Sequence, residues 1–476
     1  MTNTKPITEY SELFLSQHPA WKRTRDMIAG EDAVKAAGEA YLPRVHGQSD
    51  DSYKRYLKRV PFFPSTSRTS EGLLGLIFRV PPSLKHPDGL KDVFSTVTPD
   101  GYNFEDLARE VTTDVLATGC SGLLVDAAAS NTARNRLEAE KSGGRPFIAR
   151  YAPESILTLE TGVVNYRQVL NRVCLKESDN QVRELLLEDN IYKVRVHTKK
   201  EGENEFTIAE TIPTVKGQPL DYIPFYFVTA TGRGYKPVKA PLHDLAAHNV
   251  HIYNEQADAK NSRFYSSAPM LTIRGNNLED YKADDIVIAP GKVQLFEGHT
   301  AETPIEIKYV EFSGAGQQVL ENAVSTAKQE AATLGSSILA AERSAVEAAE
   351  THAIRRASEN SVVAAVARAI SRKLTEAFQI VAEWHDGTKP DDIAFELNTD
   401  FLPDAMDAQT ATFIMGLWQA GGISRGSMWQ VLKQGELLPS TFDEEAEAAL
   451  LDSESLTIDR PTFPAVPSVT DDENGQ

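Results

Sequence analysis

The spacing of apolar residues predicts several amphipathic helices in the first part of the chain. Apolar side chains recur there every three or four residues, which is the period of one helix face. Helices are predicted over 7–35, with Leu13, Phe14, Trp21 and Ile28 as apolar anchors, from about residue 52 to the proline turn at 61–64, over 68–78 and over 104–117. A short apolar run at 122–126 then predicts a buried strand.

After residue 147 the pattern changes to alternating apolar and polar residues, which predicts strands. Strand-like segments lie at 163–173, 182–187, 192–197, 206–210 and 224–228. A polar helix is predicted over 242–265, and a smaller group of strands follows at 270–273, 285–288, 293–296 and 305–309. We therefore expect a small β module at the tip of a two-helix stalk. An ordinary antiparallel helical hairpin in a mixed domain is the alternative.

Two alanine-rich helical patterns fill residues 316–384. Val319, Ala323, Ala327, Ala331 and Leu334 define one helix face, and Leu334–Ser337 (LGSS) is expected to interrupt it. The second pattern runs from about residue 344 to 384, and a helix of roughly 40 residues would reach about 60 Å. Helices this polar on several faces usually pack against copies of themselves or bridge between bodies. Subunits repeated in a ring would supply such neighbours.

The remaining segments complete a mixed pattern. A strand is predicted at 393–397 and a short helical unit at 407–438, with Gly421 and Gly422 between its helices. From residue 441 onward ten acidic residues face a single arginine, and the last twenty or so residues are expected to be disordered. The fold class predicted from these elements is α+β.

Composition narrows the class of protein. Of the 476 residues, 41% are hydrophobic and 25% charged, which is typical of a chain that builds real cores. No apolar run of membrane-spanning length occurs, and the N-terminus lacks the layout of a signal peptide. Cys120 and Cys174 lie in apolar surroundings, so they are expected to be reduced core residues.

The charge balance argues against a tight DNA-binding surface. The chain has 49 basic and 68 acidic residues, a formal net charge of −19. Proteins that bind nucleic acid by neutralising phosphates have the opposite sign. An acidic wall around passing DNA would avoid retention, and ordinary acidic solubility explains the same charge equally well.

Catalytic and metal-binding motifs are not found in the sequence. It contains no Walker A sequence, no GxGxxG after a strand and no CxxC pair. His243, His248 and His251 share one predicted helix, but no carboxylate ligand set accompanies them, so packing is the favoured explanation. The glycines at 232 and 234 are interpreted as a surface loop. The acidic pairs Asp284–Asp285 and Asp391–Asp392 have no setting that would tune them for acid–base work. No cofactor, metal or enzymatic activity is therefore predicted.

The order of these elements resembles that of bacteriophage portal proteins. The resemblance extends to a portal group once labelled as a domain of unknown function. Its motifs are matched at Tyr56–Phe62 (YLKRVPF), Thr66–Gly75 (TSRTSEGLLG), Gly119–Asp126 (GCSGLLVD) and Asn165–Arg167 (NYR). A two-part motif near the end of many tailed-phage portals is similar to Gly422–Arg425 (GISR) together with Gly435–Pro439 (GELLP). The motifs cover most of the chain, and their order carries the resemblance.

The resemblance implies an elongated portal-type subunit with named parts. The expected parts are a wing at 1–240, stem helices at 241–268 and 314–333, a small β clip at 269–313, a tunnel loop at 334–343, a long wing helix with a strand at 344–403, a short helical crown at 404–452 and an acidic tail at 453–476. The crown is short for a portal, so a long internal barrel is not expected.

The resemblance also implies a function and partners. Such subunits form a ring, typically of twelve, at one capsid vertex, through which double-stranded DNA is packaged and later ejected. Terminase large subunit, a head-completion or adaptor protein, and capsid and scaffolding proteins would be partners in a virion assembled in the host cytoplasm, with no membrane involved.

Specific residues are assigned to two of the implied parts. The DNA channel and tunnel loop would use Lys328, Gln329, Ser336, Ser337, Glu342 and Arg343, which form a mixed polar set rather than a basic patch. The clip would meet terminase and the adaptor through Asp284, Asp285, Lys292 and Glu297.

Two other classes of function compete with this interpretation. One is another structural connector, such as a head–tail adaptor or a capsid-associated scaffold, although those proteins are usually shorter. The other is a soluble enzyme with an elongated helical insertion, which would require a catalytic cluster. A discrete ring would indicate a portal, whereas a monomer or dimer with turnover would indicate an enzyme.

Overall fold

The structure is a computed structural model in which the chain divides into two compact units. The first unit extends to Phe401 and the second begins at Leu402. The described residues are 7–127, 145–164, 166–200, 205–266, 270–274, 306–310, 315–338, 361–401, 408–419, 421–434, 437–438, 442 and 444–455. Each unit is described by itself below.

A three-stranded antiparallel sheet with the order β11–β2–β3 lies at the centre of the first unit. Its strands are β2 (Cys120–Ala127), β3 (Pro146–Tyr151) and β11 (Phe225–Thr229). Helix α7 (Phe104–Thr118) leads into β2 and starts at Asn103, whose side chain accepts a hydrogen bond from the Asp106 N–H at 2.8 Å. The turn between α7 and β2 requires Gly119, where φ is +84° and a Cβ would lie 2.2 Å from the Val238 carbonyl oxygen.

Helix α12 (Val362–His385) supplies much of the main hydrophobic core. It contacts α7 and all three strands of the central sheet. Ser361 caps it by accepting a hydrogen bond from the Ala364 N–H at 3.1 Å. Its buried face, which includes Ile370, Leu374 and Phe378, packs in one cluster with residues of α5, α7, β2, β11 and β14. The burial of this face holds the helix against the sheet.

Five further strands form an antiparallel meander with the order β4–β5–β6–β7–β8. They are β4 (Ile156–Val164), β5 (Arg167–Ser178), β6 (Gln181–Glu188), β7 (Ile191–Lys199) and β8 (Phe206–Thr211). Two short strands, β9 (Thr214–Val215) and β10 (Gln218–Pro219), pair with each other before β11. One apolar cluster joins the meander to β2, β11 and the N-terminal aromatic residues Phe14 and Trp21.

Short helices precede the central sheet. They are α1 (Glu12–Leu15), α2 (His18–Ala29), α3 (Glu31–Ala37), α4 (Asp50–Arg59), α5 (Ser65–Ile77) and α6 (Lys91–Ser95), with 3-10 turns η1 (Gly38–Ala40) and η2 (Asp88–Leu90). Strand β1 (Ser83–Lys85) pairs with β14 (Ala394–Glu396), which follows α12 and the 3-10 turn η6 (Pro390–Asp392). The pairing of β1 with β14 joins segments far apart in the sequence.

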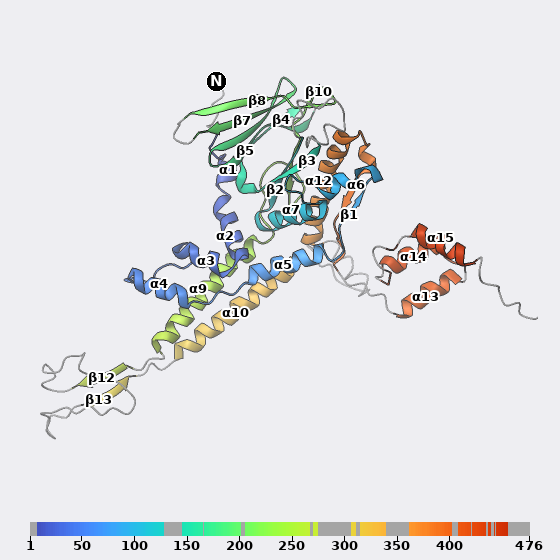
Figure 1. Ribbon diagram of the computed structural model, residues 1–476. Helices are drawn as coiled ribbons and strands as arrows, with labels where there is room; N and C mark the ends of the chain where they lie inside the picture. The colour runs from blue at the N-terminus through green and yellow to red at the C-terminus, as the bar shows by residue number, and fades with distance from the viewer. Residues whose placement is uncertain are drawn as a thin grey trace, which may run out of the picture. The chain divides into compact units, whose positions relative to one another are not determined.

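A pair of long helices is followed and preceded in the chain by the two strands of a small antiparallel sheet (Figure 1). Helices α9 (His243–Ser266) and α10 (Ala315–Ser337) run side by side, and strands β12 (Met270–Arg274) and β13 (Glu306–Val310) follow and precede them in the chain. The two strands pair antiparallel, with Met270 opposite Val310 and Arg274 opposite Glu306. The predicted β module between two helices is therefore confirmed in its described strands.

The second unit contains three described helices, which are α13 (Ala408–Gln419), α14 (Arg425–Gln434) and α15 (Glu444–Ser455). Helix α14 follows the turn at Gly421 and Gly422, as the sequence predicted. Trp429 of α14 is buried and its ring lies 5.6 Å from that of Phe442, centroid to centroid. These contacts form a small core within the unit.

The structure confirms the α+β class and corrects two predicted helix boundaries. The predicted interruption at Leu334–Ser337 is wrong, because α10 continues to Ser337. The hydroxyls of Ser336 and Ser337 donate to the Thr333 and Leu334 carbonyl oxygens, so these serines are accommodated within the helix. The single helix predicted from 344 is also wrong, because α12 starts after the Ser361 cap and has 24 residues, which corresponds to about 36 Å.

Predictions about the cysteines, membrane spans and the remaining strands can also be compared with the structure. Cys120 and Cys174 are both buried and unpaired, as expected. Among the described residues, no helix is long and apolar enough to cross a membrane. The strands predicted at 285–288 and 293–296, and the acidic tail from residue 456 onward, lie outside the described residues.

Candidate functional site

The packing of α10 on its neighbours depends on small residues along one side of the helix. Ala327 and Ala331 are buried there, and the Ala327 carbonyl oxygen accepts a hydrogen bond from His248 Nε2 of α9 at 2.7 Å. One turn further, Gly335 approaches α5, because a Cβ at this position would lie 3.2 Å from the Thr69 hydroxyl oxygen. Small side chains let the three helices approach closely.

Asn249 connects α9 to the start of α5. Its side chain is buried, and its Oδ1 accepts hydrogen bonds from the Ser65 hydroxyl at 2.8 Å, the Thr66 N–H at 3.0 Å and the Thr66 hydroxyl at 2.9 Å. Its Nδ2 donates to the Phe63 carbonyl oxygen at 2.9 Å. Pro64 precedes α5 and provides no side-chain cap, so Asn249 caps this helix from another element.

The exposed side of α10 carries a line of uncharged polar side chains. We call these residues the α10 stripe: Gln318, Asn322, Ser325, Gln329, Thr333 and Ser336, all exposed. Their spacing of three or four residues places them on one helix face. Gln318 Nε2 donates to Asn322 Oδ1 at 3.0 Å, so neighbouring members of the stripe interact. The α10 stripe therefore presents a polar surface without a fixed charge.

Two of the six predicted channel residues belong to the α10 stripe. These are Gln329 and Ser336, and Ser337 is exposed beside them. Lys328 lies off the stripe and is partly buried, with its Nζ 4.8 Å from the centroid of the Phe63 ring. Glu342 and Arg343, and the predicted clip residues Asp284, Asp285, Lys292 and Glu297, lie outside the described residues.

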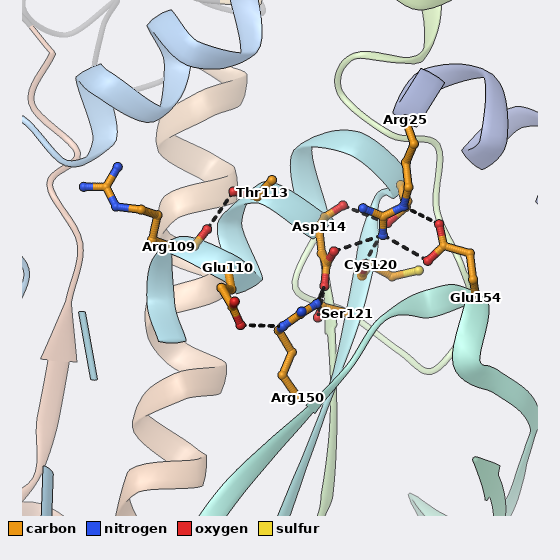
Figure 2. A network of polar contacts seen from close by, with 10 residues as sticks. Arg25, Arg109, Glu110, Thr113, Asp114, Cys120, Ser121, Arg150 and Glu154 are labelled. Atoms are coloured by element: carbon orange, nitrogen blue, oxygen red, sulfur yellow. Dashed lines mark hydrogen bonds and ion pairs between the residues drawn. The ribbon is translucent and has the colours of Figure 1, made fainter. Parts of the chain in front are cut away.

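A second cluster of polar groups joins α2 to the central sheet (Figure 2). Asp114 of α7 lies at its centre, with a side chain only 5% exposed. Its Oδ1 accepts a hydrogen bond from Arg25 Nη2 at 2.9 Å, and its Oδ2 accepts from Arg150 Nη1 at 2.6 Å and from the Ser121 hydroxyl at 3.1 Å. The two arginines, from α2 and β3, thus share one buried carboxylate.

Each of the two arginines also pairs with a second carboxylate. Glu154 forms an ion pair with Arg25, and Glu110 accepts from Arg150 Nε at 2.8 Å. Burial alone would lower the pKa of Arg25, but its hydrogen bonds to Glu154 and the charge of Asp114 outweigh burial and raise that pKa. The cluster borders an open cavity of about 1140 Å³ that is also lined by His18, Lys22 and Arg109.

The Asp114 cluster has the features of a structural ion-pair network that holds α2, α7 and β3 together. Its carboxylates and guanidinium groups are paired with one another, and the nearby Cys120 thiol is buried, which raises its pKa and makes it unreactive. The sequence holds one signal for the cluster, namely an acidic residue at position 114 on the apolar face formed by Leu107, Val111 and Val115. That signal was missed.

Two of the three histidines of α9 take part in packing, as predicted from the sequence, whereas the third, His251, is exposed. His248 bonds to α10, and His243 Nε2 lies 3.4 Å from Arg23 Nη2 of α2. Burial and the charge of Arg23 lower the pKa of His243. Within the described ranges, no group of three or more His, Cys, Asp or Glu residues is arranged to hold a metal ion.

A protein-family model matches the segment from α9 to α12. Residues 241–385 match the family model described as "Domain of unknown function (DUF4055)". No curated protein sequence matches the chain. This match concerns less than a third of the chain, and its description names no activity.

Several solved structures of gene transfer agent particles contain a similar chain. A chain in "Virion of native gene transfer agent (GTA) particle" has a TM-score of 0.40 at 14% identity. Chains in "Neck of empty GTA particle computed with C6 symmetry" and "Neck of native GTA particle computed with C12 symmetry" have TM-scores of 0.37 and 0.35 at 15% and 14% identity. Each comparison covers 87% of this chain and 100% of the other chain. Scores and identities this low establish neither a shared fold nor a shared function.

Proposed function

We propose that this chain is the portal subunit of a tailed-phage particle, a structural protein without enzymatic activity. The observation that carries the proposal is the α9–α10 helix pair with the antiparallel strand pair of β12 and β13. Helix α10 of this pair presents the uncharged α10 stripe. In this proposal the helix pair is the stem, the strand pair of β12 and β13 belongs to the clip, and the α10 stripe faces the channel.

The chemistry of the α10 stripe supports a surface along which duplex DNA slides. Cationic side chains bind phosphates and release counterions, so a dense row of them would hold the DNA in place. Amide and hydroxyl groups make weaker contacts that exchange readily with water. Lys328, the single basic residue of α10, is partly buried against Phe63 rather than aligned with the stripe.

The proposed ring has twelve subunits and lies at one vertex of the capsid. Its proposed partners are further copies of this chain, double-stranded DNA in the channel, terminase large subunit and a head-completion or adaptor protein at the clip, and capsid and scaffolding proteins around the wing. The strand pair of β12 and β13 lies in the chain between α9 and α10, at the end of the helix pair. This position supports the proposal that the strand pair contacts other proteins.

Imaging the purified full-length chain by electron microscopy tests this proposal directly. We expect end-on views of closed rings with a central hole wide enough for a DNA duplex, and a mass that corresponds to a fixed number of copies. Closed rings without a hole, or a solid particle, would favour another kind of head–tail connector. A monomer that remains solitary at all concentrations and turns over a substrate would overturn the proposal in favour of an enzyme.

A further inference from the structure

Six exposed cationic side chains gather on α4 and the last turns of α9. We call this the α4–α9 cationic surface: Lys54, Arg55, Lys58, Arg59, Lys260 and Arg263, all exposed. The four residues of α4 are spaced i, i+1, i+4 and i+5, which places them on one side of that helix. This cluster of positive charge contrasts with the net charge of −19 of the whole chain.

The two helices meet through an apolar contact, so the arrangement of these cations is fixed by the fold. Tyr53 and Tyr56 of α4 are buried in one cluster with Tyr253 and Ala257 of α9. The aromatic ring of Phe62 packs on Tyr253 at a centroid distance of 6.0 Å. The cationic side chains therefore extend from a packed base rather than from mobile segments.

A small pocket opens within this surface. It has a volume of about 180 Å³ and is lined by Tyr56, Arg59, Lys260, Asn261, Arg263 and Phe264. Phe264 is 50% exposed, and the guanidinium carbon of Arg59 lies 3.9 Å from the centroid of its ring. The pocket thus combines two aromatic residues with three cationic residues in its lining.

Most of the positive charge on this surface is not neutralised by ion pairs. Arg263 forms an ion pair with Glu321 of α10. For Lys54, Arg55, Lys58, Arg59 and Lys260, no ion pair with a carboxylate is formed within the part of the chain that the structure describes. The acidic residues Glu255 and Asp258 lie on α9 one or two turns before Lys260 and Arg263, so they reduce the local potential without pairing with these cations.

We propose that the α4–α9 cationic surface binds an acidic segment of a partner protein, with one apolar side chain of that segment inserted in the pocket. The exposed cations supply complementary charge for Asp and Glu side chains. The aromatic pocket favours a protein partner over DNA, because a duplex presents no side chain that could enter it. The size of the pocket matches a single anchoring side chain. This surface shares no residue with the α10 stripe.

Binding of a fluorescein-labelled peptide to the full-length chain tests this inference. The probe is a short Glu-rich peptide with one central leucine, and the controls are the same peptide with every Glu replaced by Gln, the all-Glu peptide and a DNA duplex of equal charge. We expect the Glu–Leu peptide to bind more tightly than any of the three controls, and its affinity to fall as salt is raised.

Matched substitutions locate the binding site. Lys260→Glu should weaken binding of the Glu–Leu peptide at least about fivefold, because it removes one exposed charge pair and places a like charge beside the acidic peptide. Lys236→Glu makes the same charge change at an exposed position outside the surface and should leave affinity unchanged. Phe264→Ala should remove the advantage of the Glu–Leu peptide over the all-Glu peptide. Circular dichroism of each variant checks that the fold is retained.

Three results would overturn the inference. The first is equal weakening by Lys260→Glu and Lys236→Glu, because binding would then follow net charge alone. The second is tighter binding of the DNA duplex than of the Glu–Leu peptide with the same dependence on Lys260, which would identify a nucleic-acid surface. The third is a Glu–Leu advantage that survives Phe264→Ala in a folded variant.

Discussion

At the scale of single residues, Asp114 has the largest expected effect on stability. It is the one carboxylate shared by Arg25 and Arg150, and it is almost fully buried. Asp114→Ala would leave two guanidinium groups facing each other without their common partner. We expect the free energy of unfolding to fall by about 2–4 kcal/mol, measured by urea denaturation.

A second substitution in the same network, at Glu110, tests whether burial of the carboxylate determines the loss of stability. Glu110 also bonds to Arg150, but its side chain is 40% exposed. Glu110→Ala should therefore cost less than about 1 kcal/mol. Equal losses for the two variants would contradict the central role of the buried carboxylate.

The pH dependence of stability is set in part by two histidines. Burial lowers the pKa of His18, although Glu154 partly offsets this, and burial with the charge of Arg23 lowers the pKa of His243. A lowered folded-state pKa means that the unfolded chain binds more protons, so stability is present above about pH 6.5 and is lost as the pH falls below it. We expect the melting temperature to decrease between about pH 7.5 and about pH 5.5.

Substitution of these histidines tests the assignment. A His18→Phe/His243→Gln double variant should show a flatter pH profile over the same range. His46→Gln changes an exposed histidine and should keep the profile of the unaltered chain. A double variant that loses stability as steeply as the unaltered chain would show that other groups control this pH range.

At the scale of secondary-structure elements, Asn249 joins α9 to α5. Its side chain makes four hydrogen bonds to Phe63, Ser65 and Thr66, and Asn249→Ala would leave buried donors at the start of α5 without an acceptor. We expect a loss of about 2–3 kcal/mol in the free energy of unfolding, measured by urea denaturation. Asn254→Ala, which removes only a bond to the Val250 carbonyl oxygen within the same helix, should cost less than about 1 kcal/mol. Similar losses for both variants would argue against capping by Asn249.

The elements that the sequence predicted well are those with local signals. Helix α7 is bounded by the Asn103 cap and by Gly119, both visible in the sequence, and its predicted range of 104–117 is one residue short. Helix α9 was predicted to within a residue at each end from its apolar spacing. In α7 the residues that determine the ends are adjacent in sequence to those ends.

The errors arise where distant contacts decide the local structure. Gly335 was expected to break α10, but its missing Cβ makes room for Thr69 of α5, a contact that no local pattern reveals. The alanine-rich pattern from 344 suggested one continuous helix, whereas Ser361 provides a cap and α12 starts there. Asp114 was overlooked because an isolated carboxylate on an apolar face has meaning only when Arg25 and Arg150 are brought to it.

The chemistry of the candidate site could be anticipated only in part from the sequence. Gln329, Ser336 and Ser337 were selected as polar residues near the end of α10, and all three are exposed. Lys328 was selected for its charge, but the fold places Phe63 against it. The chemistry of a stripe is thus visible in the sequence, while the position of one long side chain depends on a neighbour from a distant segment.

At the scale of the whole molecule, the distribution of charge leads to a prediction about DNA movement. The chain is acidic overall, yet the α10 stripe is uncharged, so a duplex beside it would meet neither strong repulsion nor strong retention. A Gln329→Lys/Ser336→Lys double variant would place two cations about two helical turns apart on the stripe. Under the proposed portal function, we expect this variant still to form rings and DNA packaging to slow several-fold, because each added phosphate contact must be broken as the duplex advances.

The control for this prediction changes charge without changing the stripe. Thr207→Lys together with Glu210→Gln adds one positive charge and removes one negative charge at exposed positions of β8, so the net charge changes by the same amount as in the stripe variant. This control variant should package DNA at the rate of the unaltered chain. Packaging is measured in vitro as protection of DNA from nuclease over time, at low and high salt. Raised salt should partly restore the rate of the stripe variant, since screening weakens phosphate contacts. Equal rates for the stripe variant and the unaltered chain would mean that α10 does not face the DNA, and the helix pair would then have to present another side to the channel.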